Sequence, residues 1–112
     1  MAVLALPTSL TLTHYEMRLS LDGVAYALVF HWNDRDESWY LDILTDEDER
    51  IASGLKIIVG WPLGIRSADL RMPAGLLMAI DTSGEGRQPA IDELGERVIL
   101  YYYEAETLFG DE

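Results

Sequence analysis

The chain has 112 residues, with 20 acidic and 8 basic side chains, two histidines and no cysteine. The formal net charge of −12 disfavours binding to nucleic-acid phosphates and to anionic membranes, because both need clustered lysine and arginine. Without cysteine the chain cannot form disulfides, thiolate zinc sites or a cysteine nucleophile. A hydrophobic share of 49% is too high for a disordered acidic chain, so we expect one domain over residues 1–112.

The N-terminal residues are apolar as far as Leu6 and are followed by Pro7. They lack the basic segment of a secretory signal, and no apolar stretch reaches the roughly 20 residues of a membrane-spanning helix. We expect residues 1–10 to form a loose arm or a first edge strand. The acidic tail, residues 104–112, is expected to fray.

Alternation of apolar and polar residues predicts an antiparallel hairpin over residues 12–32. Asp22-Gly23 lies between the two alternating runs and is a strong signal for a two-residue turn. The expected pairs are Leu21–Val24, Leu19–Tyr26, Met17–Leu28 and Tyr15–Phe30 on one face, and Ser20–Ala25, Arg18–Ala27, Glu16–Val29 and His14–His31 on the other. A slip of one residue would expose every apolar side chain, so we expect this register, with Leu19, Tyr26, Leu28 and Leu41 largely buried.

Four further strands follow in the sequence. They are expected at Trp39–Leu44, Arg50–Val59 with a bulge or bend at Gly54, Leu76–Asp81 and Arg97–Tyr103. Single helical turns are expected near Ile65–Leu70 and Ala90–Leu94. Short strands with Gly- and Pro-rich connections predict an all-β fold, a small antiparallel barrel or sandwich of about six to seven strands with short helical turns.

Asp81-Thr82-Ser83-Gly84 resembles the Asp-Thr-Gly motif of aspartic proteases, in which two chains each supply one aspartate. Here Ser83 separates Thr82 from Gly84 and breaks the turn of that motif. The alternative interpretation is a strand that ends in an aspartate, whose side chain binds the backbone of the following loop.

Three other segments have both a functional and a structural interpretation. The Gly-rich segment 83–87 lacks the lysine and the following helix of a phosphate loop, and is more typical of a flexible loop. The acidic residues 46–49 could attract Ca²⁺, but they lack the glycine of a calcium loop and are typical of a solvated turn. His14 and His31 could hold Zn²⁺ with Glu16 or Asp42, or could simply face solvent. We therefore expect no catalytic residue, no metal and no cofactor.

Aromatic and apolar residues outside the expected core are candidates for a protein interface. Trp61 lies in a segment rich in glycine and proline, and the tyrosines near the end of the chain exceed what one buried face requires. The interface candidates are Trp61, Leu63, Ile65, Met72, Tyr101 and Tyr103.

A set of motifs in a fixed order extends from Tyr15 to Tyr102. It consists of Tyr15, Leu21-Asp22-Gly23-Val24-x-Tyr26, Trp32-Asn33, Trp39-Tyr40-Leu41-Asp42-Ile43, Ile51-x-x-Gly54, Gly60-x-x-Leu63, Gly75, Asp92-Glu93-Leu94-Gly95 and Val98-x-Leu100-x-Tyr102. The order and spacing of these motifs resemble the small baseplate plug proteins of contractile-tailed phages, the cyanophage-type plug family.

The resemblance implies a structural role in the virion, at the tail baseplate, after assembly in the host cytoplasm. It implies contacts with the hub, the spike and the tube, and with further copies of the chain, and it transfers no active-site residue. Direct binding to nucleic acid or to a membrane is not expected. Two alternatives stay open: a small acidic β binding or adaptor module without catalysis, and a retroviral-type aspartic protease.

Overall fold

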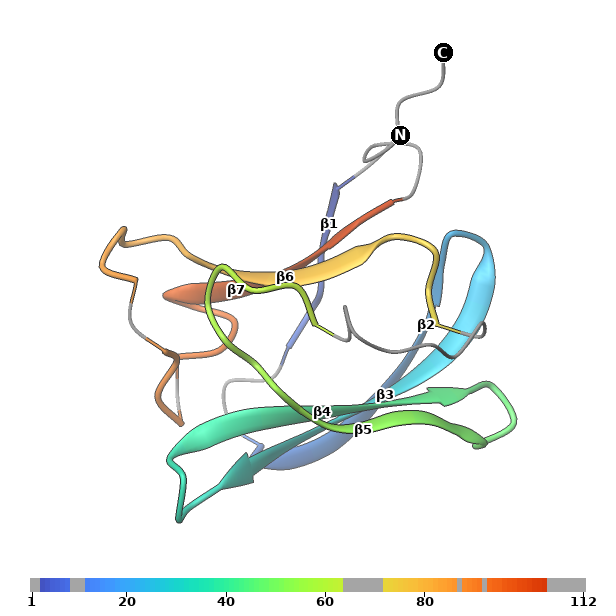
Figure 1. Ribbon diagram of the computed structural model, residues 1–112, viewed down its shortest axis with the longest axis horizontal. Coiled ribbons are helices and arrows are strands. Elements are labelled where there is room, and N and C mark those ends of the chain that lie inside the picture. The colour runs from blue at the N-terminus through green and yellow to red at the C-terminus, as the bar shows by residue number, and fades with distance from the viewer. Residues whose placement is uncertain (1–2, 9–11, 64–71, 87, 92, 105–112) are drawn as a thin grey trace.

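A computed structural model describes residues 3–8, 12–63, 72–86, 88–91 and 93–104. These residues form two antiparallel sheets packed face to face, with the core between them (Figure 1). One sheet has the strand order β2-β3-β4-β5 and the other β1-β7-β6. The strands are β1 (Val3–Ala5), β2 (His14–Leu21), β3 (Val24–Asn33), β4 (Ser38–Thr45), β5 (Arg50–Lys56), β6 (Leu76–Asp81) and β7 (Val98–Tyr103).

The predicted β2–β3 hairpin is confirmed in each of its eight pairs, from Leu21–Val24 to His14–His31. Both turn residues have a positive φ, +54° at Asp22 and +81° at Gly23, as a type I′ turn requires. Tyr26, Leu28 and Leu41 are buried as expected. Leu19 is only half-buried and packs against the edge of the core, because β2 is at the edge of its sheet and no described strand pairs with its other side.

The predicted irregularity at Gly54 is also confirmed. The pairs Leu41–Leu55 and Ile43–Ala52 leave one extra residue on β5, which is a β-bulge. The Asp42 carboxylate accepts the backbone N–H of Gly54 at 2.7 Å and so holds the bulge in place. The bulged strand ends at Lys56, three residues before the predicted end at Val59.

The second sheet includes part of the N-terminal arm. Residues Val3–Ala5 pair with Tyr101–Tyr103, so this segment is an edge strand and not a loose arm. The pairing covers one side of β7, and β6 covers the other. Because β7 is central, its alternate residues Val98, Leu100 and Tyr102 are fully buried against the first sheet.

Residues 57–63, here called the crossover segment, connect the two sheets. The segment leaves the first sheet where the Ile57 N–H binds the Trp39 carbonyl at 2.9 Å. It then runs beside β6, where the N–H groups of Gly60 and Leu63 bind the carbonyls of Ala79 and Leu77, each at 2.8 Å. A second link joins the first sheet to the loop between β6 and β7, where the indole N–H of Trp39 donates to the Ala90 carbonyl at 3.2 Å.

Of the two predicted architectures, the open sandwich is correct, because the two sheets do not close into a barrel. The described residues contain no helix. Near Ala90 there is only an i→i+3 turn, in which the Glu93 N–H binds the Ala90 carbonyl at 3.1 Å. The turn expected near Ile65–Leu70 lies outside the described residues. Within the described part of the chain, no helix is long and apolar enough to cross a membrane.

Candidate interaction surface

The outer face of the β1-β7-β6 sheet carries apolar and aromatic side chains. Along β6 and β7 buried residues alternate with half-buried ones, so the half-buried set points away from the core. Strand register places these side chains side by side across the three strands. This surface, called the outer apolar face below, consists of Val3, Ala5, Leu76, Met78, Ile80, Ile99, Tyr101 and Tyr103.

Among the residues that the structure describes, the outer apolar face has no charged side chain, in contrast to the outer face of the other sheet. On that sheet the outward positions of β2 are His14, Glu16 and Arg18. Of these, His14 pairs with His31 on β3, whose ring lies close to the Asp42 carboxylate on β4. One side of the sandwich is therefore solvated in the usual way, whereas the other presents a nonpolar sheet to solvent.

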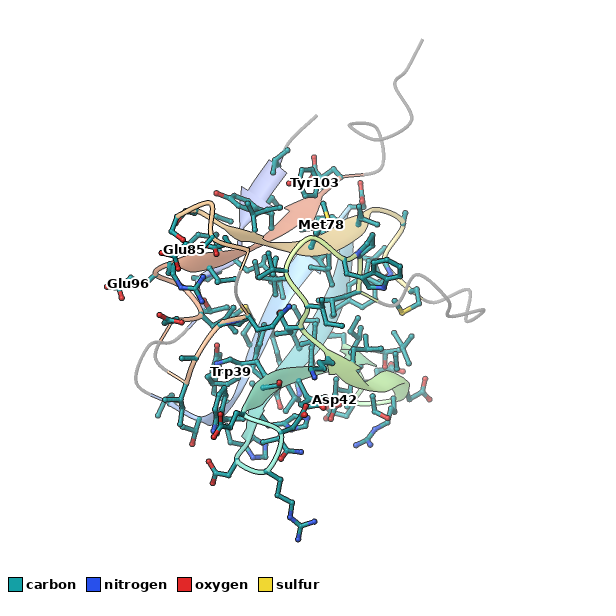
Figure 2. All side chains as sticks on the ribbon, turned by 60° about the vertical axis from the view of Figure 1, so that its left-hand side comes forward. Trp39, Asp42, Met78, Glu85, Glu96 and Tyr103 are labelled. Carbon is teal, nitrogen blue, oxygen red and sulfur yellow. The ribbon has the colours of Figure 1, made fainter. Side chains whose placement is uncertain are left out.

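Acidic residues border the outer apolar face at both ends of its strands. Glu85 and Glu96 lie exposed in the loops that follow β6 and precede β7, and Glu104 follows β7 directly. Figure 2 shows Glu85 and Glu96 projecting at one end of the sheet that carries Met78 and Tyr103. The guanidinium of the nearby Arg97 is paired with Asp81 and Glu93, and it also interacts electrostatically with Glu85.

Among the predicted interface residues that the structure describes, Trp61 is the most exposed, with 53% of its surface accessible. It lies on the crossover segment, and its own N–H binds the Ile58 carbonyl at 3.1 Å in a tight turn. The neighbouring hydrogen bonds of Gly60 and Leu63 fix this segment against β6. Trp61 is therefore held next to the sheet that carries the outer apolar face.

The other candidates divide into three groups. Tyr101 and Tyr103 lie on the outer apolar face with their ring centroids 6.3 Å apart. Leu63 is buried in the core, so the expectation that it contributes to a surface is wrong: its N–H bond to Leu77 draws the side chain inward. Met72 is half-buried against the core. Ile65 lies outside the described residues.

Asp81, the candidate protease residue, is bound in a structural network. Its carboxylate accepts the N–H and the hydroxyl of Ser83 at 2.9 and 2.7 Å, which is the loop-binding role expected for a strand-end aspartate. It also pairs with Arg97 at 2.6 Å, and Arg97 in turn pairs with Glu93 at 2.8 Å. The Arg97 hydrogen bond to Glu93 is the largest cause that raises the pKa of the guanidinium. With the Asp81 side chain only 2% exposed, the carboxylate stabilises the loop and is not presented to a substrate.

The predicted histidine pair forms without a metal-binding cluster. The rings of His14 and His31 lie 6.0 Å apart, and Nε2 of His31 lies 3.6 Å from Asp42. Among the described residues, no group of three or more histidine, aspartate or glutamate side chains is arranged to hold a metal. Residues 46–49 form the exposed turn expected of them, in which the Thr45 hydroxyl accepts the N–H groups of Glu47 and Glu49.

Sequence reasoning missed two features of this surface. It identified Tyr101 and Tyr103 but not the aliphatic residues beside them, which lie on β1, about 100 residues away in the sequence, and on β6, across the loop 82–97. It also missed the ion pairs of Arg97. The available signal for those ion pairs was the position of Arg97, a charged residue directly before the apolar strand β7.

The comparison with protein families gives a match over residues 3–106, nearly the whole chain, to the family described as cyanophage baseplate Pam3 plug gp18. The chain belongs to this baseplate plug family. Membership confirms the resemblance found in the sequence and supports a structural role in the tail baseplate of a phage virion. A plug protein of this family is expected to contact other baseplate proteins. The comparison with curated proteins gives no match.

Proposed function

We propose that this plug protein is a non-enzymatic structural component that plugs or bridges the tail tube and the hub or spike through protein contacts. The observation that carries the proposal is the family match over residues 3–106. The outer apolar face adds support, because a contiguous apolar surface on a small acidic protein is typical of a protein interface. Further copies of the chain are proposed to join the assembly, which forms in the host cytoplasm.

The location is tested on purified virions. Tails separated from capsids and analysed by mass spectrometry should contain the chain together with the hub, spike and tube proteins. Its absence from purified tails would overturn the proposal. The same result decides against a chaperone-like factor, since such a factor acts during assembly and is missing from the finished particle.

Catalysis is proposed to be absent. The aspartic protease alternative needs two exposed carboxylates that share a proton, whereas Asp81 is buried and bound by Ser83 and Arg97. Incubation with an unfolded protein substrate between about pH 3 and pH 7 should release no peptides, a range that includes the usual pKa values of carboxylates. Cleavage that is lost in Asp81→Asn would revive the protease function.

Binding to duplex DNA is proposed to be negligible at physiological salt. The net charge of −12 repels phosphates, and an acidic plug would not retain DNA that passes through the tube. A gel-shift titration should show no complex up to tens of micromolar protein, on the order of nonspecific dissociation constants. Salt-sensitive binding at micromolar concentration would contradict this.

A further inference from the structure

We propose that the outer apolar face docks a different protein, whose complementary surface is apolar at the centre and rich in lysine and arginine around it. This inference deepens the proposed function and rests on it. It names the surface of the plug protein that makes the contact and the chemistry of the partner that fits it.

The centre of the surface is defined by the outward residues of three paired strands. Register places Met78 beside Tyr101, and Tyr101 in turn beside Ala5. A second row consists of Leu76, Tyr103 and Val3, whose surface is 46% exposed. In a chain in which 25% of residues are charged, this part of the sheet surface has no charged side chain among the described residues, and apolar patches of this kind are often functional.

The size of the face indicates how much more surface the contact needs. Three strands of up to six residues cover about 20 Å by about 14 Å, or about 280 Å², from the usual strand rise and spacing. A standard protein interface buries roughly 800 Å² on each partner. The face can therefore form the centre of an interface, and the surrounding residues must contribute the rest. Trp61 on the crossover segment and the acidic loops are the described residues in position to do so.

The charges around the face determine the kind of partner. Glu96 lies exposed at one end of the face and Glu104 follows β7 at the other end, while the Arg97 guanidinium is already paired with Asp81 and Glu93. Two copies docked face to face would bring these acidic borders together, on chains that each carry a net charge of −12. A partner with basic residues at its rim removes the repulsion and gains electrostatic complementarity. Contacts between copies of the chain would then use other surfaces.

The proposal is tested by comparing two tyrosines on opposite outer faces. Tyr101 lies on the outer apolar face, and Tyr40 is a half-buried tyrosine on the outer face of the other sheet. The probes are the recombinant hub, spike and tube proteins of the same virion, each measured by biolayer interferometry. Tyr101→Ser should weaken the complex by about tenfold or more, and Tyr40→Ser by less than about threefold, because aromatic residues at an interface centre dominate affinity.

A second variant tests the charged border independently of packing. Glu96→Lys should slow association with the partner, and added salt should reduce the difference between this variant and wild type, because border charges act mainly on association rates. Glu37→Lys, at an exposed position of the β3–β4 loop, is the matched control and should leave the rate unchanged. Circular dichroism and unfolding midpoints establish that all four variants fold.

The outcomes separate this inference from the proposed function. If none of the baseplate proteins binds the wild-type chain, both are overturned. If one binds and Tyr40→Ser weakens the complex more than Tyr101→Ser, the function stands and the surface is wrong. If sedimentation velocity shows a wild-type dimer that Tyr101→Ser dissociates, the face is a self-contact and the proposed partner is wrong.

Discussion

Tyr102 on β7 donates its phenolic hydrogen to Asp22, which lies in the β2–β3 turn of the opposite sheet. The same oxygen accepts the backbone N–H of Gly75 at 2.7 Å. A Cβ atom at Gly75 would lie 2.1 Å from the Tyr103 carbonyl oxygen, so only glycine allows this close approach. The hairpin turn is thereby attached to the second sheet through a single buried side chain.

Tyr102→Phe removes both hydrogen bonds while keeping the ring in the core. We expect the free energy of unfolding to fall by about 1–3 kcal/mol, because buried polar groups lose their partner. Tyr101→Phe removes a phenol from the outer apolar face and is the control, with an expected change within about 0.5 kcal/mol. Urea unfolding followed by tryptophan fluorescence measures both. Equal stabilities of the two variants would show that the hydrogen bonds of Tyr102 do not stabilise the fold.

Alkaline pH should destabilise the fold through the same residue. Burial, followed by the hydrogen bond to Asp22, raises the pKa of Tyr102 above its ordinary value. As the pH rises above about 10, the unfolded chain loses this proton first, so the folded state binds more protons and the free energy of unfolding falls. Below about 10 the contribution is fully present. Burial also raises the pKa of Tyr26, so the decline persists in part after substitution of Tyr102.

Urea unfolding at several pH values between about 8 and 11 checks this linkage, because the range spans the ordinary tyrosine pKa. Wild type should lose stability above about pH 10, and Tyr102→Phe should lose it less steeply. Parallel pH profiles for the two proteins would show that Tyr102 does not carry the effect.

The ion pairs of Arg97 should matter far more than those of Arg18. The side chain of Arg97 is 12% exposed and pairs with the buried Asp81, whereas Arg18 is 44% exposed and pairs with Glu16 and Asp48. Arg97→Met should cost about 3–5 kcal/mol, because it removes the guanidinium from a buried carboxylate. Arg18→Met should cost at most about 1 kcal/mol, as is usual for exposed pairs. Thermal unfolding of both variants measures these losses of stability. Similar losses for the two variants would contradict the prediction that the buried ion pairs contribute more than the exposed ones.

The local parts of this fold could be predicted from the sequence. Alternation and the Asp22-Gly23 turn specify the whole β2–β3 hairpin, because its contacts involve neighbouring residues and a one-residue slip would expose the apolar face. The Gly54 bulge was likewise visible as a glycine inside a strand pattern.

The parts that depend on distant pairing could not be predicted. An edge strand near the N-terminus was one of two expectations, but nothing near Val3 indicates that it will pair with Tyr103, so its partner and the full extent of the outer apolar face follow only from the topology. Leu63 was misplaced for the same reason: its sequence neighbours Trp61 and Pro62 indicate a loop, but hydrogen bonds to β6 turn its side chain inward. The local sequence pattern around a residue does not show which distant strand that residue will pair with.

The core prediction is tested at the centre of the hairpin. Leu28 is fully buried, so Leu28→Ala should lower the free energy of unfolding by about 2–5 kcal/mol through lost contacts and a cavity. Val24 is 53% exposed on the same strand, and Val24→Ala should cost less than about 0.5 kcal/mol. Denaturant midpoints of the two variants give the comparison. A small loss for Leu28→Ala would mean that the hairpin does not face the core.

Trp61 should matter for assembly and not for folding. With 53% of its surface exposed on the crossover segment, its side chain contributes little to the core. If it anchors the edge of the interface, Trp61→Ala should weaken binding to the baseplate partner by about 2 kcal/mol or more, as for an interface hot spot. Trp39→Phe is the contrasting variant: Trp39 is buried and donates to the Ala90 carbonyl, so its substitution should lower stability and leave affinity of the folded protein unchanged. Calorimetric titration against the partner, together with unfolding midpoints, separates the two effects. A Trp61→Ala variant that binds as tightly as wild type would exclude this residue from the contact and restrict the interface to the sheet itself.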